Sequence, residues 1–241
     1  MADGELVVAT YNVHGCVGVD GRFRPDRIAE VIREIGADVV GLQEVDRRVR
    51  RGRPTLELEM LAGGSGLACF AGPTIVDPDG DYGNGLLSRY PVRALRHLDL
   101  TVGRREPRGA IDADLDVEGD LVRVVVTHLG LGIPERRDQV SRLLASIGES
   151  DDPVVLLGDV NEWHPFSRSL RLLEARLGPS ARGRTFPSVL PLLALDRIWA
   201  SPRRAIVEAR VHATPLARVA SDHLPLVARI RYRDFGGTIQ R

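Results

Sequence analysis

The 241-residue sequence contains no lysine, so all 33 of its basic residues are arginines. This absence excludes lysine Schiff-base chemistry and P-loop chemistry, because both need a lysine amine. The basic residues are balanced by 33 acidic ones. The chain therefore has no overall positive charge that would draw it onto nucleic acid or an anionic membrane.

Cysteine is also scarce, since Cys16 and Cys69 are the only two and no CxxC pair occurs. A disulfide framework and a zinc site are therefore unsupported, and Cys16 is expected to be a buried free thiol. No apolar run reaches transmembrane length, and the acidic N-terminus lacks the features of a signal peptide. We expect a cytoplasmic protein without stable membrane insertion.

The distribution of apolar residues indicates strands and helices that follow one another along the whole chain. Apolar β-branched runs predict strands, and apolar residues at the i, i+3, i+4, i+7 spacing predict helices. With no repeat and no long linker, this order indicates a single α/β domain over 1–234 and a frayed tail over 235–241. The predicted strands cover 6–13, 38–45, 67–71, 85–88, 92–98, 110–117, 121–127, 153–157, 192–199, 205–211 and 224–232, and the predicted helices cover 25–35, 56–61, 134–147 and 165–177.

Short polar clusters stand at the ends of several of these strands. They contain asparagine, glutamate, aspartate and histidine, which offer hard oxygen ligands and proton carriers on rigid supports. Such groups suit a Mg²⁺ or Mn²⁺ ion and a phosphate ester. The clusters are Thr10–Gly15, Leu42–Asp46, Thr127–Leu129, Gly158–Asn161, Leu195–Ile198 and Ser221–His223.

In order along the chain, the motifs TYNVHG, LQEVD, GNGLLSRYP, THLG, GDVNEW, LDRIWA and SDHLPL resemble those of the endonuclease/exonuclease/phosphatase superfamily, which has the deoxyribonuclease-I-like fold. The resemblance extends from Thr10 to Pro225. It implies a four-layered α/β sandwich, in which two face-to-face mixed sheets are flanked by helices and the active site lies at one end of the sheets.

The resemblance also implies a metal site. Asn12 and Glu44 match the family's metal pair, and Asp222 of the terminal Asp-His signature is assigned to the same ion. A short set of hard ligands that leaves room for water is well suited to Mg²⁺. We therefore expect Mg²⁺, or Mn²⁺ in its place, as the cofactor.

Five further positions match the family's catalytic residues. Asp159 and Asn161 correspond to the pair that orients the attacking water and holds a non-bridging phosphate oxygen. Their i, i+2 spacing sends both side chains to the same side of an extended segment. Val160 stands between them, where the family usually has an aromatic residue or leucine. His128 matches a mid-chain histidine suited to contact a phosphate or to protonate a leaving oxygen.

The terminal histidine of the signature is His223, and Asp196 is expected to accept its far N–H and to fix its tautomer. His223 could hydrogen-bond the phosphoryl oxygen or take the proton of the water. Asp159 is the rival general base. The sequence leaves this choice open.

Two groups are expected to bind the substrate. Asn84 lies in the stretch that would approach His128, and Arg108 could place a guanidinium on the phosphate. A solvated surface position is the alternative for Arg108. His14 lies beside Asn12, and for it a direct role and a supporting role both remain open.

Two other segments carry weaker signals. Residues 77–81 hint at a calcium loop, but Tyr82 and Ser88 stand where an EF-hand needs glycine and glutamate, so a turn is predicted. The arginine-rich segment 47–53 could contact a polyanionic substrate or form a solvated loop.

Together these features predict a metal-dependent phosphoesterase, most plausibly a phosphodiesterase, that hydrolyses a P–O bond by in-line attack of water. A DNA or RNA nuclease is one alternative, although aromatic residues make up only 5% of the chain. A phospholipid or inositol head-group hydrolase is another, with Pro187–Leu193 as a candidate apolar surface near the site. A non-catalytic binding module would be expected to lack Glu44, Asp159 or His223, and all are present.

Overall fold

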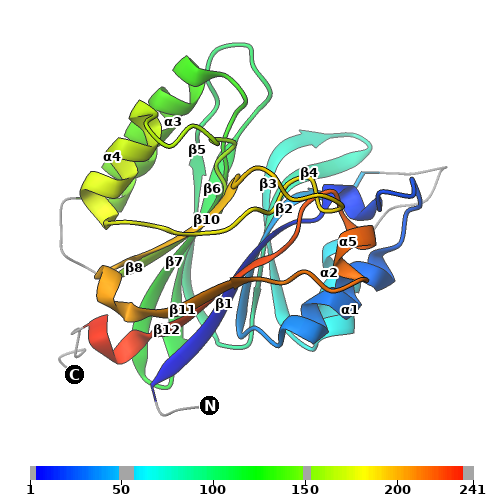
Figure 1. Cartoon of the computed structure of the whole chain (residues 1–241), viewed down its shortest axis with the longest axis horizontal. Helices are drawn as coiled ribbons and strands as arrows, with labels where there is room; N and C mark the ends of the chain where they lie inside the picture. Colours follow the sequence, from blue (N-terminus) through cyan, green and yellow to red (C-terminus); the bar gives the residue numbers. More distant parts are fainter. Residues whose placement is uncertain (1–3, 49–56, 149–152, 236–241) are drawn as a thin grey trace.

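The computed structural model describes residues 4–48, 57–148 and 153–235, and these form two mixed β-sheets of six strands each (Figure 1). The first sheet has the order β11 (Ile206–Val211), β12 (Leu226–Arg231), β1 (Glu5–Asn12), β2 (Val39–Asp46), β4 (Gly80–Ser88) and β3 (Ala68–Asp77). The second has the order β5 (Val92–Asp99), β6 (Gly109–Val117), β7 (Asp120–His128), β8 (Val154–Asp159), β10 (Asp196–Ser201) and β9 (Ala181–Arg182).

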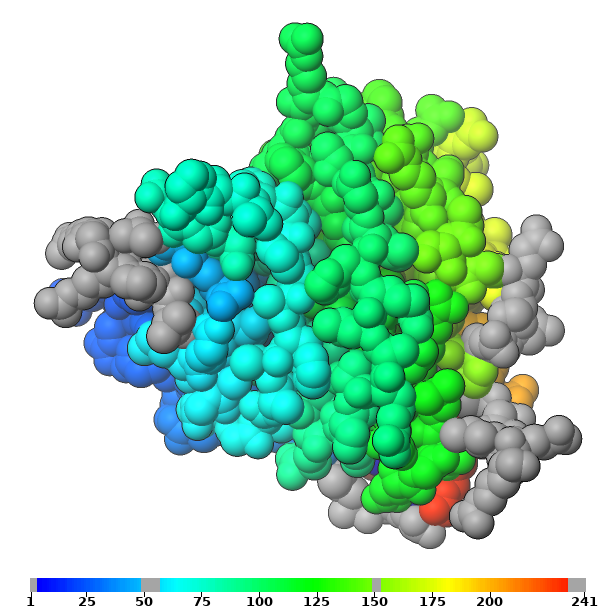
Figure 2. Space-filling model, turned by 180° about the vertical axis from the view of Figure 1, so that it is seen from behind, coloured from blue at the N-terminus to red at the C-terminus, as the bar shows by residue number. Residues whose placement is uncertain are grey.

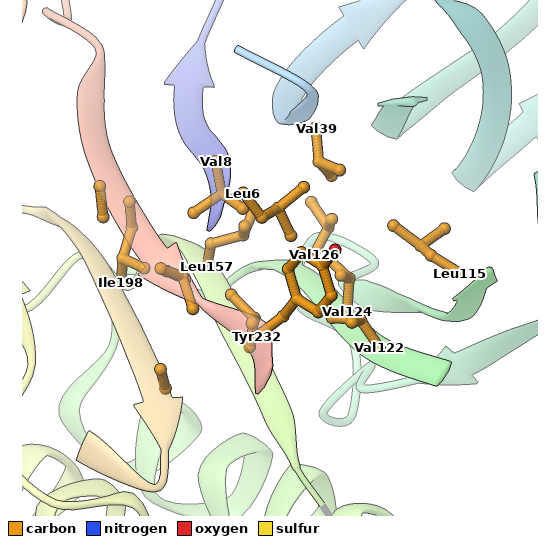
Figure 3. Packing of buried hydrophobic residues seen from close by; sticks show 14 of the residues in the cluster. Leu6, Val8, Val39, Leu115, Val122, Val124, Val126, Leu157, Ile198 and Tyr232 are labelled. Atoms are coloured by element: carbon orange, nitrogen blue, oxygen red, sulfur yellow. The ribbon is translucent and has the colours of Figure 1, made fainter. Parts of the chain in front are cut away.

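The two sheets pack face to face through a shared apolar core. Val8 and Val39 of the first sheet and Val126 and Leu157 of the second belong to the same cluster of buried side chains, and they point toward one another (Figure 3). From behind, the cyan segments of the first sheet lie directly against the green segments of the second (Figure 2). Gly41 allows this close approach, because a Cβ there would lie 1.9 Å from the Leu157 Cδ1 atom.

Helices cover the outer faces of both sheets and complete the four layers that the sequence predicts. The apolar faces of α1 (Pro25–Ile35), α2 (Glu57–Ser65) and α5 (Ala217–Ala220) pack on the first sheet. Those of α3 (Ile133–Ile147) and α4 (Arg168–Leu177) pack on the second. The remaining helices are the short 3₁₀ turns η1 (His14–Cys16), η2 (Arg203–Ala205) and η3 (Tyr232–Phe235).

Some helix boundaries differ from prediction. The helix predicted over 56–61 continues through Gly63 and Gly64 to Ser65. A Cβ at Gly64 would lie 2.6 Å from the Ala29 Cβ atom, so the glycine allows α2 to pack closely on α1. The helix predicted over 165–177 begins only at Arg168, because Ser167 caps it by accepting the Leu170 N–H at 3.2 Å.

Several strands also differ from their predicted extents. The strand predicted over 192–199 begins only at Asp196, and β3 and β4 are longer than predicted. The 77–81 segment forms the turn of the β3–β4 hairpin, as predicted. The organisation as one domain remains a prediction, and residues 236–241 of the predicted tail lie outside the described residues. Within the described ranges, no helix combines the length and the apolarity needed to cross a bilayer.

Candidate active site

The polar residues at the strand ends meet at one edge of the sandwich. Strand β7 runs parallel to β8 with His128 beside Asp159, and β10 runs antiparallel to β8 with Asp196 opposite Asp159. Asn12 ends β1 in the other sheet. Its amide Nδ2 atom donates to the Glu44 carboxylate at 2.8 Å and to the Asp159 carboxylate at 3.2 Å. One buried amide therefore joins carboxylates from both sheets.

Two site residues adopt left-handed backbone conformations that favour glycine. Glu44 has φ +58° and lies in an irregularity of β2, where the pairing with β4 shifts between Leu42 and Val45. Asn161 has φ +51° just after β8. Such conformations are costly for residues with a side chain and cluster at functional sites. At Glu44 the irregularity directs the carboxylate toward Asn12.

Asp159 is the centre of the site and is almost completely buried. Its Oδ1 atom accepts the Asn161 N–H at 2.9 Å, and its Oδ2 atom lies 3.6 Å from His128 Nε2 and 3.7 Å from His223 Nε2. Burial and the neighbouring Asp196 raise the pKa of Asp159, whereas the two histidines oppose this shift. A carboxylate with a raised pKa is suited to accept a proton near neutral pH.

His223 is held by a buried carboxylate, in the arrangement expected from the sequence. Its Nδ1 atom lies 2.9 Å from Asp196 Oδ2, which also accepts the Thr185 hydroxyl at 2.5 Å. Burial alone would lower the pKa of His223, but Asp196, Asp159 and Asp222 outweigh it and raise the pKa to about 10. The imidazole is therefore positively charged at neutral pH.

His128 has the opposite electrostatic character. Burial lowers its pKa to about 3, with Arg108 and His223 acting in the same direction against Asp159. Its Nδ1 atom lies 3.1 Å from Arg108 Nη1. Because a guanidinium can only donate, a hydrogen bond with Arg108 requires Nδ1 to accept. The other ring nitrogen, Nε2, lies 3.1 Å from Asn161 Nδ2, which is also a donor, and 3.6 Å from the Asp159 carboxylate, which is an acceptor.

The other predicted residues lie around this centre. Asp222 is about one-third exposed, and its carboxylate lies 3.4 Å from the Ser221 hydroxyl and 3.8 Å from His14 Nδ1. No direct contact joins it to Glu44 or Asn12 in the described part of the chain. Asn84 is buried and donates to the Gly109 carbonyl at 3.0 Å, and its Oδ1 atom has no protein partner among the described residues.

Arg108 is buried rather than on the surface, and besides His128 it contacts Glu106 at 3.2 Å. Within the arginine-rich segment, Arg47 pairs with Asp81 and Glu59, and Arg48 pairs with Asp46. The side chains of Arg47 and Arg48 are therefore already paired with carboxylates of the protein. Residues 49–53 lie outside the described residues.

Three residues of the site were not identified from the sequence. Thr185 donates to Asp196, and the Ser221 hydroxyl donates to the Asn12 carbonyl at 2.7 Å. Tyr82 lies next to the site, where burial and Glu44 raise the pKa of its phenol. A signal for Ser221 was present in the SDH motif. Thr185 precedes Asp196 by eleven residues, and nothing local indicates their contact.

The residues of this site fit a divalent cation. Glu44 and Asp159 converge on one amide, and this concentration of negative charge would be relieved by a dication bound through hard oxygen ligands. Ligand atoms of Asp159, Asp196 and His223 also lie within 4.8 Å of one another. His223 and Asp196 are already hydrogen-bonded to each other, however, so the Glu44 side suits an ion better.

Comparisons with known proteins agree with this geometry. A sequence profile described as "Endonuclease/Exonuclease/phosphatase family" matches residues 9–223. The chain is 33% identical to the uncharacterized protein YbhP of Escherichia coli (strain K12), over 92% of this chain and 95% of that protein.

Solved structures of similar fold include an endonuclease/exonuclease/phosphatase from Beutenbergia cavernae, with a TM-score of 0.80, 27% identity and coverage of 94% of this chain and 71% of that one. The human Nocturnin catalytic domain with bound sulfate anion has a TM-score of 0.71 and 22% identity, covering 94% of each chain.

Proposed function

Because the chain belongs to the endonuclease/exonuclease/phosphatase family, we propose that it is a divalent-metal-dependent phosphodiesterase that uses an activated water. Members of the family are generally hydrolases of phosphate esters, typically with divalent metal ions. The observation that carries the proposal is the convergence on Asp159, where Asn12, His128 and His223 from three distant segments all lie within 4 Å of its carboxylate.

Glu44 and Asn12 would hold Mg²⁺ or Mn²⁺, with Asp222 as a further ligand on the side of His14. The ion would polarise the phosphoryl oxygen and stabilise the leaving alkoxide. Support for these positions comes from the Asn12 amide, which contacts the carboxylates of both Glu44 and Asp159. The partly exposed Asp222 side chain, near His14, also supports them.

Asp159 accepts the proton of the attacking water in this proposal. Its pKa is raised by burial, whereas His223 is held charged by Asp196 and has no free capacity to accept a proton. His223 instead donates from Nε2 to a phosphoryl oxygen. Asn161 and neutral His128 add hydrogen bonds, and the guanidinium of Arg108 orients His128.

Asn84 would orient the substrate through its Oδ1 atom, which has no protein partner in the described part of the chain. The substrate is a phosphate ester in this proposal, and nucleic acid is one possible source of it.

The test is hydrolysis of bis(4-nitrophenyl) phosphate, a soluble diester, and of the corresponding monoester, with Mg²⁺, with Mn²⁺ and with EDTA. We expect metal-dependent hydrolysis of the diester and a loss of about 10³-fold or more in Asp159→Ala. Asp138→Ala is the matched control, because Asp138 lies on α3 and pairs with Arg142. Hydrolysis that persists in EDTA, or a folded Asp159→Ala variant with unchanged rate, would contradict the proposal.

A further inference from the structure

Four large apolar side chains are exposed on the two loops that follow β7 and β8 and at the first residue of α3. Leu131 is 73% exposed, Ile133 64%, Trp163 60% and Phe166 76%. We refer to these four residues as the apolar rim. Single exposed apolar residues are ordinary, but a group of them beside a functional site marks an interaction surface.

A buried ion pair ties the two loops of the apolar rim together. Arg136 contacts Glu162 at 3.0 Å, with both side chains about 5% exposed or less, and it also donates to the Leu131 carbonyl at 2.6 Å. The other oxygen of Glu162 accepts the His164 N–H at 3.1 Å. Burying such a pair costs desolvation energy, and breaking it would leave a buried charge without a partner. The pair therefore fixes the position of the two loops relative to each other. The apolar rim is thus preformed.

The apolar rim adjoins the proposed active site. It begins just after His128 and Asn161, and the Asn161 amide donates to the Leu129 carbonyl at 2.8 Å. On the other side of the site, the ring of Phe186 lies 4.8 Å from that of His223 and starts a second exposed apolar segment. The large exposed residues of that segment are Val189, Leu190 and Leu192.

Arginines accompany the apolar rim. Helices α3 and α4 lie side by side (Figure 1), and the lining of a groove of about 360 Å³ between them includes Arg137, Arg168 and Asp138. The Asp138 carboxylate is paired with Arg142. Neither Arg137 nor Arg168 forms an ion pair within the described residues. Both lie within one or two turns of the helix starts that follow the apolar rim.

This combination matches the interface of a bilayer better than a nucleic acid. Leu131 and Ile133 offer aliphatic groups on which bases cannot stack. Tryptophan, phenylalanine and leucine are typical of apolar surfaces buried at the boundary between headgroups and acyl chains. Long arginine side chains can reach lipid phosphates from the edge of an inserted apolar surface.

We propose that the apolar rim inserts into the surface of an anionic phospholipid bilayer, with Arg137 and Arg168 on lipid phosphates, so that the phosphodiester headgroup of a membrane lipid enters the site. This inference rests on the proposed function and narrows its substrate class.

The two tryptophans of the chain make a direct test possible. Trp163 is 60% exposed, whereas Trp199 is completely buried, so a change of environment at a docked surface reports on Trp163. The full chain is mixed with phosphatidylcholine vesicles that contain or lack phosphatidylglycerol, with brominated acyl chains as quenchers. We expect a blue shift and quenching with the anionic vesicles, and neither in Trp163→Phe.

Matched variants locate the surface. Leu131→Ser combined with Phe166→Ser should weaken vesicle partition by about tenfold or more, because two large apolar groups no longer insert. Leu121→Ser is the control, since Leu121 is also exposed but lies at the opposite end of β7. Arg137→Gln and Arg168→Gln should each weaken binding to the anionic vesicles by roughly fivefold, from about 1 kcal/mol per charge.

The outcomes separate this inference from the proposed function. Asp159→Ala should bind vesicles like the wild type, and the Leu131→Ser/Phe166→Ser variant should hydrolyse the soluble diester at the wild-type rate. Quenching of Trp163 without hydrolysis of any phosphodiester would support the surface and overturn the proposed function. If vesicles leave Trp163 unchanged, or if only single-stranded DNA quenches it, the inference is overturned while the proposed function is untouched.

Discussion

Replacing Asp196 by asparagine tests the electrostatic design of the site most directly. Asparagine keeps the shape of the side chain but removes the charge that faces His223 Nδ1 at 2.9 Å. A hydrogen bond between charged groups contributes about 1.5–3 kcal/mol. Since about 1.4 kcal/mol corresponds to tenfold in rate, kcat should fall roughly 10- to 150-fold.

The assay is steady-state hydrolysis of the soluble diester at saturating metal. A positioning role predicts that kcat falls while KM changes little, because Asp196 acts through His223. Asp196→Glu should restore part of the rate. Asp116→Asn, on β6 and paired with Arg93, is the control for removal of an unrelated carboxylate charge. A correctly folded Asp196→Asn variant whose kcat falls by less than about threefold would refute the reasoning.

Three further predictions concern packing, acid stability and metal binding. Gly41→Val should destabilise the protein by about 1–3 kcal/mol, because its Cβ would overlap Leu157; an unchanged midpoint of thermal unfolding would contradict this. Asp112→Asn should cost about 1–3 kcal/mol in a urea titration, because two partly exposed arginines lose a charged hydrogen-bond partner. Burial raises the pKa of Asp112, but these arginines outweigh it and hold the pKa below its usual 3.8. Its contribution to stability is therefore present above that value and is lost as the pH falls through the depressed pKa, and Asp112→Asn should show a weaker acid dependence of unfolding. Glu44→Gln should raise the Mg²⁺ concentration for half-maximal activity by about tenfold or more, and an unchanged metal titration would remove Glu44 from the ion.

Much of the fold could be predicted because its signals are local. Helix α1 begins at Pro25 and ends at Ile35, as its apolar spacing indicates. The neighbouring positions of His128 and Asp159 also follow from local order, since both end parallel strands at one edge of the second sheet. The sequence motifs indicated the family, and the structure has the fold of that family.

The remaining features depend on contacts between distant segments. The left-handed conformation of Glu44 arises from irregular pairing of β2 with β4, which the pattern of apolar residues does not record. The hydroxyl of Thr185 has meaning only after the chain has folded back on Asp196. Likewise, α2 can continue past Gly63 and Gly64 only because α1 lies against it.

The amide of Asn12 connects residues of the two sheets, and this has a consequence for how the protein gains activity as it folds. Neither half of the sandwich holds a complete set of reactive groups: one provides Asn12 and Glu44, and the other provides Asp159 and His128. Catalytic activity should therefore appear only when the two sheets have packed together in their native arrangement. During refolding, turnover would report that last assembly step and would lag behind the recovery of secondary structure.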